Sequence, residues 1–164
     1  MTEEELQKQI DEIQEVEKEI RAIAHNLNSN LFSNNATFEG IVKELFVKIK
    51  NHSQLSLILQ VSDTIDWELI SNTIKVNLFR IIQEALQNIE KYAQATSVVI
   101  YITTTNKHEV EMTITDDGIG FEPTKKASGI GLNNMKMRTE ELNGTFTITS
   151  EKDKGTKINL KIKL

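Results

Sequence analysis

Three polar residues within a stretch of helical period have the chemistry and spacing of a metal–phosphate site. Glu84, Asn88 and Lys91 follow one another at i, i+4 and i+7, so a helix would present them on one face. Carboxylate and amide oxygens suit a Mg²⁺ ion that keeps some waters and bridges to phosphates, and the lysine would add positive charge. A solvated helix face with a Glu–Lys pair is the competing interpretation of this segment alone.

A turn that carries carboxylates follows the strand expected at residues 109–115. Its sequence, residues 116–121, is Asp-Asp-Gly-Ile-Gly-Phe. Asp116 at the end of the strand could accept a hydrogen bond from an exocyclic amine such as that of adenine, and Gly118 lets the backbone turn sharply beside a ligand. An ordinary tight turn in which aspartate bonds its own backbone is the alternative, and the second glycine, Gly120, favours the ligand site.

A second glycine pair precedes another expected helix. Gly129 and Gly131 lead through Leu132 into a segment of helical period, and the free N–H groups at such a helix start can bind phosphate. The two known phosphate loops do not fit, because G-x-G-x-x-G spacing is missing and the glycine upstream of a Walker lysine is missing. The glycines therefore indicate another kind of nucleotide site.

The helices and strands that would position these residues can be predicted from the spacing of the apolar residues along the sequence. Residues 3–31 predict a long amphipathic helix with a heptad seam, and residues 38–49 predict a second helix after a polar turn, so the two suggest an antiparallel hairpin. A helix over residues 73–92 and another over 132–142 alternate with strands near 55–61, 97–104, 109–115, 145–150 and 157–164. We expect a helical region at 1–52, then an α+β domain at 53–164 with a two-layer sandwich and a mostly antiparallel sheet.

The order of these pieces closely resembles the ATP-binding domain of histidine kinases, within the superfamily that also holds gyrase, the heat-shock-ninety proteins and MutL. Residues 80–93 are similar to its N box, 116–121 to its first glycine box and 129–132 to its second. The resemblance covers about residues 55–164 and implies a Bergerat-type fold that binds ATP and Mg²⁺.

The resemblance also implies roles for individual residues. Glu84 would be the base or water-positioning residue and a metal ligand, Asn88 the magnesium ligand, Lys91 a phosphate contact and Asp116 the acid that recognises adenine. The remaining expected nucleotide contacts are Gly118, Gly120, Gly129, Gly131, Leu132 and Thr156. Residues 122–128 would form a short lid, as in kinases of the nitrate-sensor type, and Tyr92 stands where many relatives have histidine.

His25 is the one histidine on the first expected helix, at an outer heptad position where its side chain would be exposed. The segment around it is similar to the phospho-acceptor box of the commoner histidine kinases, which implies that its imidazole attacks the γ-phosphate. Asn26 replaces the acid that usually follows the acceptor. If the helix is aligned instead with kinases of the nitrate-sensor type, the acceptor position falls on Asn28. This second alignment leaves the chain without an acceptor histidine.

The composition of the chain argues against some classes of binding partner and indicates where the protein is located. A net charge of −5 without a basic stripe argues against nucleic-acid binding. The chain has no cysteine, no signal peptide pattern and no apolar stretch near the ~20 residues of a membrane span, so a cytoplasmic setting is expected, with any membrane tether outside this chain. The resemblance implies a homodimer through the first helices and a response-regulator receiver domain as partner. A degenerate docking module and an anti-sigma-type serine kinase remain the alternatives.

Overall fold

The computed structural model describes residues 7, 16, 32, 36–105, 108–122 and 129–164. The chain divides into one unit of residues 1–36 and a second of residues 37–164. In the first unit Gln7 and Val16 are helical, and the rest of the expected helix, with His25, Asn26 and Asn28, lies outside the described residues. The account below concerns the second unit.

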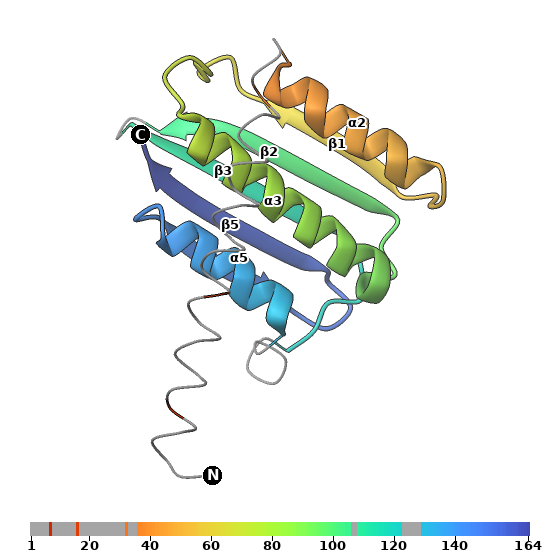
Figure 1. The fold of residues 1–164 in the computed structure, drawn as a ribbon. Helices are drawn as coiled ribbons and strands as arrows, with labels where there is room; N and C mark the ends of the chain where they lie inside the picture. The colour runs from red at the N-terminus through yellow and green to blue at the C-terminus, as the bar shows by residue number, and fades with distance from the viewer. Residues whose placement is uncertain (1–6, 8–15, 17–31, 33–35, 106–107, 123–128) are drawn as a thin grey trace. The chain divides into compact units, whose positions relative to one another are not determined.

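A five-stranded sheet forms one layer of the second unit (Figure 1). Its strands are β1 (Ser56–Val61), β2 (Ser97–Thr105), β3 (Glu109–Asp116), β4 (Thr145–Ser150) and β5 (Thr156–Lys163), in the spatial order β1-β2-β3-β5-β4. Only the β1–β2 pair is parallel; the other three pairs are antiparallel. The expected two-layer α+β sandwich with a mostly antiparallel sheet is therefore confirmed.

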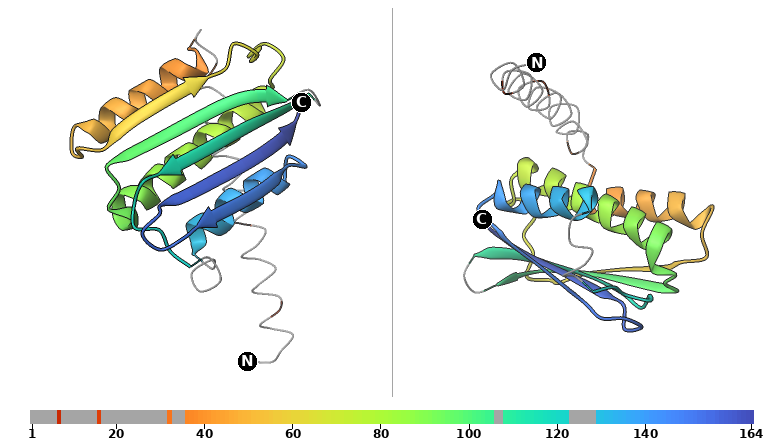
Figure 2. Two further views of the ribbon diagram at one scale, coloured as in Figure 1. Left: turned by 180° about the vertical axis from the view of Figure 1, so that it is seen from behind. Right: turned by 90° about the horizontal axis from the view of Figure 1, so that it is seen from below.

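The helical layer covers one face of this sheet, and no described helix of the second unit lies on the other face (Figure 2). It consists of α2 (Phe38–Lys50), α3 (Asn72–Asn88) with its π-helical continuation η2 (Ile89–Ala93), and α5 (Ile130–Glu140). Alternate residues of the central strands and one face of α3 form the core, in which Leu78, Ile81, Ile82, Leu86, Ile100, Ile102, Met112, Ile114, Leu160 and Ile162 are fully buried. Each such side chain contributes about 1.5–3 kcal/mol to folding, so α3 is fixed firmly on the sheet.

Helix α2 belongs to the same unit as the sheet, which corrects the boundary expected at residues 52–53. Thr37 caps the helix by accepting a hydrogen bond from Gly40 N at 3.1 Å. The ring of Phe38 stacks on Trp67 with centroids 4.6 Å apart, and Trp67 Nε1 donates to Glu39 Oε1 at 3.2 Å. The helical period over 38–49 predicted a buried face correctly, but the sheet domain begins at Thr37.

Within residues 36–105, 108–122 and 129–164, no helix combines the length and the apolar character that a membrane crossing needs.

Candidate functional site

Helix α3 presents two of the expected ligands on its less buried side. Ser71 caps the helix by accepting from Ile74 N at 3.3 Å, and the apolar residues of its opposite face pack on the sheet. Glu84 and Asn88, one turn apart near the C-terminal end of α3, are half-buried. The sequence-based placement of both residues on one helical face is confirmed.

The helix changes its winding immediately after Asn88. Residues Ile89–Ala93 form a π turn that ends at Gln94 in the left-handed region, with φ of 51°. Such π turns are rare and occur frequently at functional sites. Because the winding changes here, α-helical spacing does not place Lys91 with Glu84 and Asn88, and its side chain is exposed. The helix expected to run regularly to Tyr92 therefore needs this correction.

The π turn supports the loop that follows β3. Ile119 N donates to the Ala93 carbonyl at 2.8 Å. A Cβ on Gly118 would collide with the same carbonyl, and would lie 2.8 Å from Asp116 Oδ1. Glycine is required at 118 because the two backbones approach so closely. The end of η2 therefore packs against the first glycine box. This contact lies near the N-terminal end of α5 (Figure 1).

Asp116 is the buried carboxylate of this loop, with only 5% of its surface exposed. Burial raises its pKa above the ordinary value of 3.8, the negative charge of Asp117 adds to this, and backbone hydrogen bonds from Gly118 and Thr156 oppose it. Gly118 N donates to Asp116 Oδ1 at 2.9 Å. A buried carboxylate with fixed orientation is well suited to accept a hydrogen bond from a ligand amine.

Asp117 has a structural role that differs from the role of Asp116. Its carboxylate accepts hydrogen bonds from Thr96 N at 2.8 Å, Thr96 Oγ1 at 2.6 Å and Ser97 N at 2.9 Å. These bonds lower its pKa, the hydroxyl of Thr96 contributing most. Asp117 therefore fixes the beginning of β2 to the end of β3, and the structure separates two adjacent acids that the sequence alone does not distinguish.

Ser150 at the end of β4 anchors the far side of the loop. Its Oγ accepts from Phe121 N at 2.9 Å, donates to the Gly155 carbonyl at 3.0 Å and lies 2.9 Å from Thr156 Oγ1. Gly155, with φ of +77°, packs against the Asp116 backbone. Sequence analysis included Thr156 among the site residues but missed Ser150, because neither motif spacing nor charge indicates that a strand residue reaches this loop.

The second glycine box lies against Glu84 and Asn88 of α3. Gly129 is the N-cap of α5, and a Cβ there would meet no atom within 4 Å. A Cβ on Gly131, in contrast, would collide with the Glu84 carboxylate and lie 3.0 Å from Asn88 Nδ2. The first turn of α5, whose N–H groups lack intrahelical acceptors, therefore faces a carboxylate and an amide with no intervening side chain.

The structure thus brings the predicted residues together in two groups joined by the Ala93–Ile119 hydrogen bond. One group contains Glu84, Asn88 and Gly131, and the other contains Asp116, Gly118 and Thr156. Gly120 adopts φ of +58° in the same loop, and Leu132 is half-buried on α5. Most of the expected lid, residues 123–128, lies outside the described residues.

Comparison with known families agrees with this geometry. Residues 67–164 match the family model of the histidine kinase-, DNA gyrase B- and HSP90-like ATPases. The chain belongs to this family. The match contains every site residue from Glu84 to Thr156, and the expected resemblance to sensor histidine kinases with such an ATPase domain is confirmed.

Individual relatives are named as a sensor histidine kinase and a sensor protein. The chain is 31% identical over 149 residues to the sensor histidine kinase LiaS of Bacillus subtilis, a match that covers 90% of this chain and 40% of LiaS. It is 29% identical over 153 residues to the sensor protein VraS of Staphylococcus aureus (strain COL), covering 93% of this chain and 42% of VraS. The chain thus spans about two fifths of the length of these relatives.

Solved structures show the same fold at lower identity. The blue-light activated histidine kinase of Erythrobacter litoralis EL346 superposes with a TM-score of 0.64 at 20% identity, over 76% of this chain and 40% of that protein. The histidine kinase AdeS of Acinetobacter baumannii gives a TM-score of 0.61 at 16% identity, over 99% of this chain and 86% of that one. At these identities the likeness supports the fold alone.

Proposed function

We propose that this chain is the core of a two-component sensor histidine kinase and that residues 37–164 bind Mg·ATP. The observation that carries the proposal is the contact of Gly131 with Glu84 and Asn88, which leaves the first turn of α5 open to two oxygen-bearing side chains. A helix start of this kind attracts phosphate, and the two side chains suit a hydrated magnesium ion.

The donor set fits magnesium better than a metal held by protein alone. Among the described residues, no group of three or more His, Cys, Asp and Glu side chains could hold an ion. Magnesium commonly uses one or two protein oxygens and completes its shell with water and phosphate. Asn88 Oδ1 and a Glu84 carboxylate oxygen would supply those protein ligands, whereas a phosphate contact by Lys91 rests on the resemblance and not on the spacing along the helix.

The nucleotide base would be recognised at the other group. The buried carboxylate of Asp116 accepts hydrogen bonds and already holds Gly118 N, so an adenine amine would find an oriented acceptor there. Gly118 keeps a side chain away from this carboxylate, and the backbone of Thr156 donates a further hydrogen bond to it. Bound ATP supplies the γ-phosphoryl group, and Glu84 would act as the base or water-positioning residue.

Phosphoryl transfer would follow the scheme of two-component kinases. His25 would accept the phosphate within a homodimer formed by the N-terminal helices, and the receiver domain of a response regulator would take it in turn. These steps rest on the resemblance and on relatives that are named as sensor histidine kinases. Asn26 and Asn28 motivate one rival, a module that binds nucleotide and docks a partner without catalysis.

Incubation with γ-labelled ATP and magnesium separates these possibilities. Acid-labile label on the parent chain that is lost in His25→Gln supports the proposal. Acid-stable label indicates a serine kinase of the anti-sigma type, and nucleotide binding without label indicates the docking module. Label that persists in His25→Gln contradicts the acceptor assignment while leaving the nucleotide site intact.

A further inference from the structure

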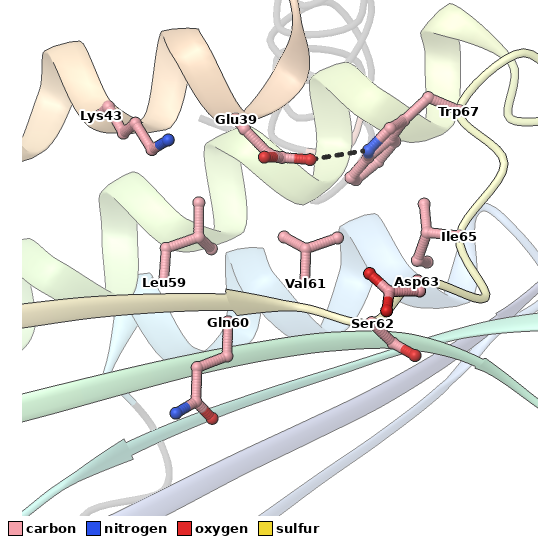
Figure 3. A pocket seen from close by; sticks show the side chains of 9 residues that line it. All are labelled: Glu39, Lys43, Leu59, Gln60, Val61, Ser62, Asp63, Ile65 and Trp67. Carbon is pink, nitrogen blue, oxygen red and sulfur yellow. Dashed lines mark hydrogen bonds between the residues drawn. The ribbon is translucent and has the colours of Figure 1, made fainter.

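A second recess lies far from the nucleotide site, between α2 and β1. It has a volume of about 670 Å³, and its walls include Leu59, Val61 and Trp67 (Figure 3). The loop that closes it leads into the N-terminal end of α3, whereas Glu84 and Asn88 lie toward the opposite end, roughly 18 Å along the helix. The recess is therefore separate from the nucleotide site.

The free edge of the sheet runs along this recess. Strand β1 is an edge strand. Ser56 N donates to Thr96 O and Ser62 N donates to Ile102 O, both at 2.9 Å, so the even-numbered residues bond to β2. In a parallel pair the alternate residues direct their N–H and C=O groups the other way. Among the residues that the structure describes, the outward N–H and C=O groups of Leu59 and Val61 thus have no strand partner, while their side chains line the recess.

Opposite charges stand at the two ends of the recess. Lys43 projects from α2 near Leu59, and Asp63 follows the end of β1 (Figure 3). Both side chains are exposed, and neither forms an ion pair within the described part of the chain. Between these ends the lining is mixed: it combines apolar side chains (Leu59, Val61, Ile65 and Trp67) with polar ones (Gln60, Ser62 and Glu39), and Glu39 is held by the Trp67 indole. An occupant would place apolar residues against Leu59 and Val61 and one charge of each sign at the two ends.

We propose that this edge binds an extended segment of a partner protein as an added antiparallel strand. Its first residue would be basic and lie opposite Asp63, its last would be acidic and lie opposite Lys43, and alternate apolar side chains would contact Leu59 and Val61. Antiparallel pairing is the more stable arrangement, and added strands are a recurring mode of peptide recognition. A second copy paired through β1 would bring its own α2 beside this one, so a single strand fits the recess better.

The single tryptophan of the chain makes the test direct. The probe is the peptide acetyl-Lys-Thr-Val-Thr-Val-Thr-Glu-amide, titrated into the full 164-residue chain while Trp67 fluorescence is followed. We expect a saturable change in emission. A peptide with the terminal Lys and Glu exchanged should bind roughly fivefold more weakly, since both charge pairs become repulsive. Equal binding of the two peptides, or no change in emission, would overturn the proposal.

Two variants locate the binding. Val61→Pro removes an outward N–H at a position where an edge strand tolerates proline, so peptide binding should be lost while the unfolding temperature changes little. Asp63→Lys alters an exposed side chain and should shift preference toward the exchanged peptide, whereas Glu68→Lys on the same loop is the matched control and should not. If Asp63→Lys behaves like the control, the proposal fails. If the peptide does not bind and Val61→Pro instead reduces the sedimenting mass, β1 pairs with a second copy and the partner-strand proposal is wrong.

Discussion

The α carbon of Gly131 is so close to α3 that an added Cβ would lie 3.0 Å from Asn88 Nδ2 and collide with Glu84. Gly131 is therefore important for its lack of a side chain and not for its backbone flexibility, because it lets the start of α5 approach the polar face of α3. This contact joins the second glycine box to the N box, so the proposed nucleotide site depends on the absence of a side chain at residue 131.

Gly131→Ala should therefore weaken Mg·ATP binding by about tenfold or more, equivalent to about 1.4 kcal/mol. The added methyl group would displace the Glu84 carboxylate or tilt α5. Gly129→Ala is the matched control, since no atom lies within 4 Å of a Cβ there. Calorimetric titration of both variants measures the difference. Equal affinities for the two would show that the close contact is not part of the binding site.

Asn88→Ala should reduce the affinity for Mg·ATP by roughly 10- to 100-fold, the range expected when a charge-assisted contact is lost. Binding of ATP in EDTA should change much less, because the asparagine is proposed to act through the metal. The side chain is half-buried and lies at the end of α3, so the fold should persist. A loss of similar size with and without magnesium would argue against a metal-ligand role.

Asp116→Asn should weaken ATP binding and yet raise the midpoint of thermal unfolding near pH 7. Burial raises the pKa of Asp116, so the native protein binds more protons than the unfolded chain between pH 3.8 and the raised pKa. Stability therefore falls as pH rises through that window, and above it the buried charge opposes folding. Asparagine removes this charge and can still accept from Gly118 N. Thermal scans from pH 3.5 to 7 test the sign; a less stable variant at pH 7 would contradict it.

Asp117→Ala should do the reverse, destabilising the fold by about 1 kcal/mol at neutral pH while leaving ATP affinity nearly unchanged. The lowered pKa of Asp117 means that its stabilising effect is present above pH 3.8 and is lost as pH falls further. The difference from the parent chain should accordingly shrink in acid. A large loss of nucleotide affinity would show that the second acid also belongs to the site.

The sequence predicted which candidate residues would lie close together better than it predicted what surrounds them. Local spacing revealed Glu84, Asn88 and the glycine pairs, because those signals lie within single helices and turns. Helical period showed that residues 38–49 bury one face, but period cannot reveal what covers that face, and the contact with Trp67 comes from a distant loop.

Two other features had no local signal. The π turn at Ile89–Ala93 depends on how the end of α3 meets the first glycine box, through the Ala93–Ile119 hydrogen bond. Ser150 reaches the same loop only because β4 pairs beside β5 at the edge of the sheet. Tertiary contacts of this kind are decided by the assembled sheet, and no short segment contains them.

The most direct test of the account is a crystal structure of the chain with magnesium and a non-hydrolysable ATP analogue. The account predicts the adenine amine at the Asp116 carboxylate, the metal at Asn88 and the phosphates at the first turn of α5. A nucleotide bound elsewhere, or a site between α3 and α5 filled by packed side chains and closed to the analogue, would contradict it.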